Sequence, residues 1–215
     1  MKPLLVLRPE PGNRATIERA QAMGLEARAC PLFSIEAVNW TAPDPHEFDA
    51  LLYTSANALR HGGEALATLT ALPVLAVGRA TAEAAKLSGF NVTMTGSDDV
   101  QALLEVLPGA QRMLHLTGAD HRHLETRHAV ETIIVYASIA LEAAIIPSGE
   151  FVALVHSPRA GARLAALAPD RGKVSVAAIS ARAAAACGPG WAATAVSAQP
   201  DDSALLAVAA RLCQD

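Results

Sequence analysis

Two turns in the sequence carry hydroxyl side chains where a strand gives way to a helix, and such turns can bind an anion. Residues 53–57 read Tyr-Thr-Ser-Ala-Asn, and residues 156–159 read His-Ser-Pro-Arg. The first N–H groups of a helix lack partners within it, so a helix N-terminus attracts negative charge. Thr54 or Ser55 alone could equally be an ordinary N-cap. The recurrence of the turn at Ser157 favours a functional pair that holds a small anionic ligand.

Other candidates follow neighbouring strands. Gly78 opens a further strand-to-helix turn, where either close approach of a ligand or an ordinary tight turn explains a glycine. Arg8 comes directly after the first predicted strand, and its guanidinium can pair with a carboxylate or simply face solvent. Segment 117–122 ends its strand at Gly118 and offers a weaker anion contact.

One phenol stands apart from the other candidates. Tyr136 lies in an extended segment, and its apparent counterpart in the first half of the chain is Phe33. A tyrosine on a strand is either a core residue whose hydroxyl finds a partner or, in a cleft, a proton donor. The residues alone leave both interpretations open.

Several familiar sites are missing or poorly supported. The sequence lacks the nucleotide-binding signatures G-x-x-x-x-G-K-[ST] and G-x-G-x-x-G. Histidines cluster at 115, 121, 123 and 128, but His121 and His123 would diverge on a helix, so we expect a polar helix and no metal site. Acidic pairs at 98–99 and 201–202 precede apolar helical runs and are explained as charges at helix N-termini.

The elements that must position these residues alternate regularly along the chain. Short apolar runs between alanine-rich helical stretches are the signature of βα units on a parallel sheet. A helix is predicted from about Asn13 to Gly24, where glycine can adopt the left-handed conformation that ends a helix. Further helices are predicted in the gaps. The predicted strands are residues 4–7, 25–29, 50–53, 74–77, 91–94, 113–116, 152–155, 175–179 and 193–196.

The chain nearly repeats itself, and this is its most informative feature. The matched segments are 50–57 with 152–159, 76–80 with 178–182, and 4–9 with 113–118. The second pair places Ser180 where the first half has Gly78. The repeat covers essentially the whole chain.

Two extended segments, 31–38 and 132–139, are β-rich and too long for ordinary loops. If both cross between lobes, the N-terminal βαβ unit joins the C-terminal part of the chain. We therefore predict an α/β fold of two flavodoxin-like, doubly wound parallel-sheet lobes, joined by a two-stranded β ladder and sharing a cleft. The expected lobes are residues 1–34 plus 142–215 and residues 40–130, with connecting strands at 35–39 and 131–141.

Composition and charge narrow the function further. The 215 residues are 52% hydrophobic and 18% charged, which favours a buried core, and the net charge of -4 gives no reason to expect nucleic acid or an anionic membrane as a partner. Three cysteines without C-x-x-C spacing make disulfides and a thiolate metal site unexpected and fit a reducing cytoplasm. The N-terminal apolar run is interpreted as a strand and not as a signal peptide, and no segment is long enough to span a bilayer.

The order and spacing of five motifs resemble the uroporphyrinogen-III synthase family over the length of the chain. These motifs are Val-Leu-Arg-Pro at 6–9, Tyr-Thr-Ser-Ala-Asn-Ala at 53–58, Val-Gly-Arg-Ala-Thr-Ala at 77–82, Val-Tyr at 135–136 and Ser-Pro-Arg at 157–159. The resemblance implies two lobes joined by a two-stranded ladder, and an enzyme of the carbon–oxygen lyase class that uses no cofactor or metal.

The resemblance also implies a substrate and a reaction. Hydroxymethylbilane, a linear tetrapyrrole with eight carboxylates, loses water, inverts its terminal ring through a spiro intermediate and closes to uroporphyrinogen III in haem biosynthesis. The bilane closes unaided to the non-inverted isomer, so the demand on the protein is confinement and orientation.

Carried over by position, Tyr136 becomes the catalytic residue, which assists departure of the terminal hydroxyl as water. The resemblance implies substrate contacts at Arg8, Thr54, Ser55, Gly78, Thr81, Gly118, Ser157 and Ser180. Segment 179–183 lacks the threonine found at Thr81, and the glycines at 62–63 weaken the helix after Ser55. The contacts with the substrate are therefore expected to differ from the family pattern at these two places.

The competing hypothesis is a non-catalytic, cytosolic two-lobed binding protein for a small polycarboxylate, because the same helix N-termini would serve capture without chemistry. In either case we expect a cytoplasmic monomer with no nucleic-acid or membrane partner. As an enzyme it could make transient contact with the enzyme that precedes it in the pathway.

Overall fold

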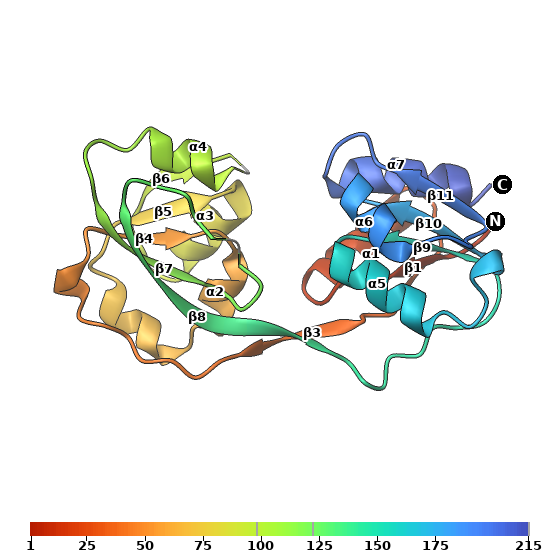
Figure 1. The fold of residues 1–215 in the computed structure, drawn as a ribbon, viewed down its shortest axis with the longest axis horizontal. Helices are drawn as coiled ribbons and strands as arrows, with labels where there is room; N and C mark the ends of the chain where they lie inside the picture. Colours follow the sequence, from red (N-terminus) through yellow and green to blue (C-terminus); the bar gives the residue numbers. More distant parts are fainter. Residues whose placement is uncertain (98, 122, 215) are drawn as a thin grey trace. The chain divides into compact units, whose positions relative to one another are not determined.

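The computed structural model describes residues 1–97, 99–121 and 123–214. Two compact units divide the chain, one formed by Met1–Ser34 with Ile139–Asp215 and the other by Ile35–Ser138. Each is a mixed α/β unit with helices packed on a parallel sheet (Figure 1). Two residues of the predicted motifs, Asp98 of the first acidic pair and Arg122 of segment 117–122, lie outside the described residues.

The first unit is built on a five-stranded parallel sheet with the order β11-β10-β9-β1-β2. Helices α5 and α6 pack on one face of this sheet, and α1 and α7 pack on the other. The strands are β1 (Leu4–Val6), β2 (Ala27–Ala29), β9 (Phe151–Val155), β10 (Val174–Ala178) and β11 (Ala193–Val196). The helices are α1 (Gly12–Ala22), α5 (Pro158–Leu167), α6 (Ala181–Cys187) and α7 (Asp202–Leu212), with a 3₁₀ turn η3 (Arg171–Lys173).

The second unit is built on a six-stranded sheet with the order β3-β8-β7-β4-β5-β6. Helices α2 and α3 cover one face, and α4 covers the other. The strands are β3 (Phe33–Ala37), β4 (Ala50–Tyr53), β5 (Val74–Val77), β6 (Val92–Gly96), β7 (Arg112–Gly118) and β8 (Ala129–Ala140). The helices are α2 (Ala56–His61), α3 (Arg79–Leu87) and α4 (Val100–Glu105), with 3₁₀ turns η1 (Pro45–Glu47) and η2 (Glu64–Leu69).

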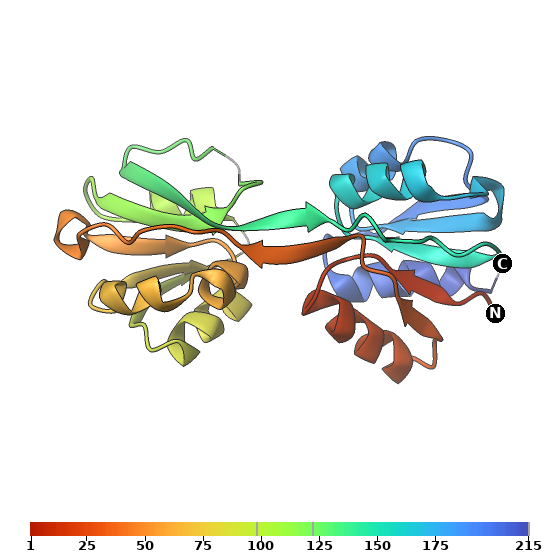
Figure 2. The same ribbon diagram turned by 90° about the horizontal axis from the view of Figure 1, so that it is seen from below.

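The two extended segments predicted from the sequence are β3 and β8, which lie side by side and run in opposite directions (Figure 2). Backbone hydrogen bonds link Val38 to Val135 and Leu141 to Leu32. Both strands continue across the boundaries between the two units along the chain.

The internal repeat is confirmed by the pairing of the strands. Ala50 on β4 pairs with Met113 on β7, and Val152, the counterpart of Ala50, pairs with Leu4, the counterpart of Met113. Replacing β4 to β8 in the second sheet by β9, β10, β11, β1 and β2 reproduces the order of the first sheet. Equivalent strands therefore present equivalent carboxyl-end turns in each unit.

All nine predicted strands are present, and Gly24 has the left-handed backbone expected after α1, with a φ of 75°. The polar helix predicted at His121 and His123 is wrong, because the described residues between β7 and β8 form a loop. Leu124 is its only large apolar side chain, so a helix would have had no apolar stripe to bury against the sheet. No helix in the described part of the chain is long and apolar enough to cross a bilayer.

Candidate functional site

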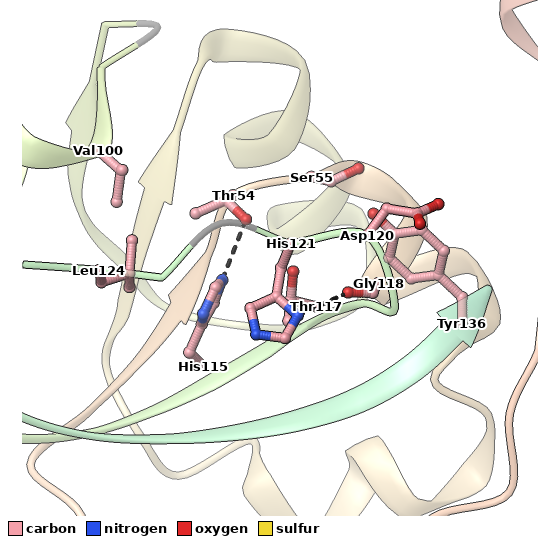
Figure 3. A pocket seen from close by; sticks show the side chains of 10 residues that line it. All are labelled: Thr54, Ser55, Val100, His115, Thr117, Gly118, Asp120, His121, Leu124 and Tyr136. Carbon is pink, nitrogen blue, oxygen red and sulfur yellow. Dashed lines mark hydrogen bonds between the residues drawn. The ribbon is translucent and has the colours of Figure 1, made fainter. Parts of the chain in front are cut away.

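A cavity of about 280 Å³ opens in the second unit beside the carboxyl ends of β4 and β7 (Figure 3). This edge is where ligands bind in open parallel sheets. The lining residues are Thr54, Ser55, Val100, His115, Thr117, Gly118, Asp120, His121, Leu124 and Tyr136. Four of the residues predicted from the sequence, Thr54, Ser55, Gly118 and Tyr136, are thus brought together.

An irregularity in the pairing of β7 and β8 places Tyr136 at the cavity. Thr117 pairs with Ile134, but the next residue, Gly118, pairs with Tyr136, so that Val135 is an extra residue on β8. An inserted residue of this kind re-aims the side chain that follows it. Val135 is buried in the core, whereas Tyr136 is half-buried and lines the cavity.

Gly118 makes room for the phenol of Tyr136. A Cβ atom at this position would lie 2.5 Å from Cε2 and Cζ of the ring and 2.9 Å from its hydroxyl oxygen. The Gly118 carbonyl accepts a hydrogen bond from the backbone N–H of His121 and lies 3.1 Å from His121 Nδ1. Gly118 therefore supports Tyr136 directly, a pairing that sequence reasoning missed.

The turn after β4 combines a helix cap with a contact to a buried histidine. The hydroxyl of Ser55 accepts a hydrogen bond from the Asn57 N–H at 3.2 Å and so caps α2. Thr54 Oγ1 lies 3.1 Å from His115 Nε2. Burial, assisted by the neighbouring His121, lowers the pKa of His115 to about 4. The His115 imidazole is therefore neutral near pH 7.

Two further predicted residues lie in the second unit but are not among the described residues that line the cavity. Gly78 precedes α3 with a φ of 82°, which requires glycine, and its N–H donates to the Gly96 carbonyl. Thr81 is buried in the first turn of α3. The structure thus places both at the base of a neighbouring strand-to-helix turn.

In the first unit the predicted serines begin helices at the carboxyl ends of β9 and β10. Ser157 Oγ accepts a hydrogen bond from the Ala160 N–H at 3.1 Å and caps α5. Ser180 Oγ accepts from the Ala183 N–H at 3.2 Å and caps α6. Both hydroxyls are half-exposed, so capping leaves them near the surface of the same sheet edge.

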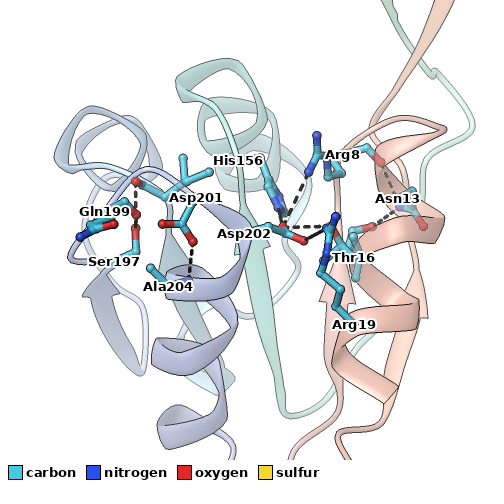
Figure 4. Close-up of polar contacts among 12 residues, drawn as sticks. Arg8, Asn13, Thr16, Arg19, His156, Ser197, Gln199, Asp201, Asp202 and Ala204 are labelled. Carbon is cyan, nitrogen blue, oxygen red and sulfur yellow. Dashed lines mark hydrogen bonds and ion pairs between the residues drawn. The ribbon is translucent and has the colours of Figure 1, made fainter. Parts of the chain in front are cut away.

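A carboxylate–cation cluster joins the start of α7 to α1 and to the turns after β1 and β9 (Figure 4). Asp202 is 2.8 Å from His156 Nε2, 3.0 Å from Thr16 Oγ1, 2.5 Å from Arg19 Nη1 and 3.7 Å from Arg8 Nη1. Burial acts to raise the pKa of Asp202, but hydrogen bonds from His156, Arg19 and Thr16 outweigh it and lower the pKa to about 2. Asp202 is therefore ionised and is the carboxylate that Arg8 faces in the structure.

The described members of the acidic pairs, Asp99, Asp201 and Asp202, do lie at helix N-termini, as predicted. Asp99 accepts a hydrogen bond from the Gln101 N–H at the start of α4, and Asp201 accepts one from the Ala204 N–H at the start of α7. Asp202 goes beyond the predicted helix-end charge, because its partners come from α1 and from the turns after β1 and β9.

The backbone around Arg8 is held by a buried asparagine that sequence reasoning did not single out. Asn13 Nδ2 donates to the carbonyls of Val6, at 2.8 Å, and Arg8, at 2.9 Å. A Cβ atom on Gly12 would lie 2.6 Å from Arg8 Nη2. The start of α1 therefore fixes where the guanidinium lies, and an asparagine just after a proline–glycine turn was the available signal.

The cavity of the second unit brings several hydrogen-bond donors next to a phenol, and the carboxyl group of Asp120 also lines it. It presents hydroxyls from Thr54, Ser55, Thr117 and Tyr136, and Val100 and Leu124 add apolar walls. A phenol beside such a site can donate a proton to a leaving hydroxyl. Among the described residues no three His, Cys, Asp or Glu side chains are grouped so that they could hold a metal ion.

Comparison with known proteins gives a family and a fold. The family described as uroporphyrinogen-III synthase HemD matches residues 14–207. The uroporphyrinogen-III synthetase of Helicobacter pylori 26695 is similar in structure, with a TM-score of 0.71 and 17% identity over 99% of this chain and 100% of that one. A mutant uroporphyrinogen III synthase of Thermus thermophilus is also similar, with a TM-score of 0.53 and 17% identity over 99% and 100% of the two chains. No curated protein matches the sequence significantly.

Proposed function

Because the chain belongs to the uroporphyrinogen-III synthase family, we propose that it converts hydroxymethylbilane into uroporphyrinogen III. The family match extends over residues 14–207, and this observation carries the proposal. The cavity at the carboxyl ends of β4 and β7 supports it, because hydroxyl donors and a phenol meet there.

The reaction begins with loss of the substrate's terminal hydroxyl as water. The hydroxyl group must receive a proton in order to leave as water. We propose that the Tyr136 phenol donates this proton, because Gly118 and the extra residue Val135 turn its ring towards the cavity. The pyrrole at the other end of the chain attacks the resulting cation through the ring carbon that already carries its methylene bridge, which gives a spiro intermediate. The older bridge bond then breaks and re-forms at the free α-carbon of the same ring, whose proton is lost, so that this ring is inverted in the closed product. Orientation of the ends of a flexible chain can contribute about 7 to 11 kcal/mol to such a step.

The eight carboxylates of the bilane need hydrogen-bond donors, and the predicted contacts supply them. Thr54 and Ser55 line the cavity, and Gly118 positions the phenol. We keep Gly78 and Thr81 of the second unit as proposed contacts through the turn before α3. The proposed contacts of the first unit are Arg8, Ser157 and Ser180, which lie at the carboxyl ends of β1, β9 and β10.

We also propose that the two units are flavodoxin-like, doubly wound lobes joined by the β3–β8 ladder. In chain order the strands of the first unit give 2-1-3-4-5, the flavodoxin-like arrangement, and the repeat relates the second sheet to it. The proposed lobes remain 1–34 plus 142–215 and 40–130, with 35–39 and 131–141 as connections. We propose a cytoplasmic monomeric carbon–oxygen lyase that needs no cofactor and makes at most transient contact with the preceding enzyme.

The test is to supply the purified protein with hydroxymethylbilane and to separate the product isomers. Formation of the type III isomer above the spontaneous background supports the proposal, and a product that is entirely type I overturns it. The alternative, a binding protein for a small polycarboxylate, predicts no type III product and no effect of Tyr136→Phe on the rate of bilane closure. Membership of the family does not favour that alternative.

A further inference from the structure

Two buried histidines of the second unit differ in how their ring nitrogens are used. His128 has both nitrogens bonded, because Nδ1 accepts from the Gln111 N–H at 3.1 Å and Nε2 lies 3.0 Å from the Leu104 carbonyl. His115 is 1% exposed, and its Nδ1 has no hydrogen-bond partner in the described part of the chain. Of these two buried histidines, His115 lines the cavity and His128 does not. His128 is therefore a satisfied core residue, whereas His115 is not.

His115 lies on a face of the sheet that is lined by apolar side chains of β4 and β7 where it extends away from the cavity. Side chains alternate along a strand, so His115 shares its face with Met113, and Leu52 shares that face from β4. An imidazole with one free nitrogen costs stability in such surroundings, where a leucine would pack without an unpaired polar atom. Among the described residues its one hydrogen-bond partner is the hydroxyl of Thr54, at 3.1 Å, and the ring of His121 packs edge-on against it with the ring centroids 6.3 Å apart.

The unpaired nitrogen indicates which atom of His115 carries the proton. A buried N–H without an acceptor is rarer in proteins than an unpaired acceptor, so the proton belongs on Nε2 and the lone pair on Nδ1. Nε2–H then donates to Thr54 Oγ1. Because the Thr54 oxygen accepts this hydrogen bond, the Thr54 O–H does not donate to His115 and remains available to donate to a ligand in the cavity.

We propose that His115 is a positioning residue, which holds the Thr54 hydroxyl so that it donates to a carboxylate of the substrate. This inference rests on the proposed function, since the ligand is taken to be the bilane. The carboxylate takes no part in the bonds that form or break, so its contact is expected to be the same in the ground state and in the transition state. Loss of the contact should therefore raise KM and leave kcat nearly unchanged.

The experiment compares His115→Leu, Thr54→Val and the double variant in steady-state formation of the type III isomer. Each single change should raise KM about 10- to 150-fold, as expected for one hydrogen bond to a charged group, with kcat within about 2-fold. The double variant should be no worse than Thr54→Val, because His115 acts through Thr54. His115→Gln, whose side-chain N–H can replace Nε2–H, should restore KM to within about 2-fold of the wild type.

His128→Leu is the matched control, since it removes an equally buried histidine outside the cavity. His128→Leu should lower Tm and leave KM unchanged. If His115 had a purely structural role, His115→Leu would give the same result. Fold-changes in KM that multiply in the double variant, or a normal KM in His115→Leu, overturn the inference. If His115→Leu does not fold, His115→Asn takes its place, because an asparagine cannot reach Thr54 from the Nδ1 position.

A second measurement separates this inference from the proposed function. Fluorescence titration with uroporphyrin III, which bears the same eight carboxylates, measures binding without turnover. If the wild type forms no type III isomer, the proposed function fails. If both single variants lose uroporphyrin affinity and the double variant loses no more than Thr54→Val, the His115–Thr54 coupling is still supported. Losses that multiply in the double variant, or no loss in the single variants, would contradict it.

Discussion

Replacing Gly118 by alanine should displace the phenol on which the proposed chemistry depends. The new Cβ would lie 2.5 Å from two ring carbons of Tyr136, whereas carbon atoms in good contact are about 3.5 to 4.0 Å apart. The ring must therefore move by roughly 1 Å or more, because the other atoms at the contact are backbone of β7. A misplacement of that size at a reacting group costs about 100-fold in rate. The added strain should lower the free energy of unfolding by about 1 to 3 kcal/mol.

The assay is the rate of type III formation by Gly118→Ala, with urea unfolding measured in parallel. Gly172→Ala is a matched control, because its new Cβ would meet no described atom closer than 3.5 Å, and its rate should be normal. In a Tyr136→Phe background the alanine should reduce the rate little further, since the hydroxyl it displaces is already gone. A wild-type rate in Gly118→Ala, or an equally large loss in the Tyr136→Phe background, would refute the argument.

The other predictions concern the phenol and the first unit. Tyr136→Phe should slow type III formation by about one to three orders of magnitude, or about 1.4 to 4 kcal/mol in the barrier, with Tm unchanged in a thermal melt. The pKa of Asp202 is lowered from 3.8 to about 2, and this shift corresponds to about 2 kcal/mol of stability of the folded state. That stability is present above pH 4 and is lost as the pH falls through about 2. Asp202→Asn should accordingly lower the free energy of urea unfolding at pH 7, and its deficit should shrink towards pH 2; a deficit independent of pH would contradict the assignment. Asn13→Ala removes two hydrogen bonds to backbone carbonyls and should cost about 1 to 3 kcal/mol in the same unfolding assay, and a neutral result would contradict that role.

The strands and the duplicated architecture were accessible from the sequence because they depend on local patterns. Apolar runs of four or five residues marked the strands, and Gly24 marked the end of α1. The repeat then related the turn at Ser55 to that at Ser157, and both serines cap helices in the structure. The sequence left two interpretations of these turns open, helix capping and anion binding. Capping by the serines does not exclude anion binding.

The features that shape the cavity depend on pairing between distant residues, and local patterns do not encode them. The extra residue Val135, which turns Tyr136, exists only relative to β7. The contact between Thr16 and Asp202 joins residues 186 positions apart, so the sequence showed only a helix-end charge. The loop that holds His121 and His123 was mistaken for a helix because alternation of strands and helices was extended to a segment without an apolar stripe.

The most direct test of the account is the isomer composition of the product as the amount of protein is raised at a fixed concentration of hydroxymethylbilane. The spontaneous reaction gives the non-inverted type I isomer, so only a protein that confines the chain can change the ratio. We predict that the type III fraction rises with protein concentration until it dominates, and that Tyr136→Phe shifts this rise to higher protein concentration. A product that stays type I at every concentration of folded wild-type protein would contradict the central claim.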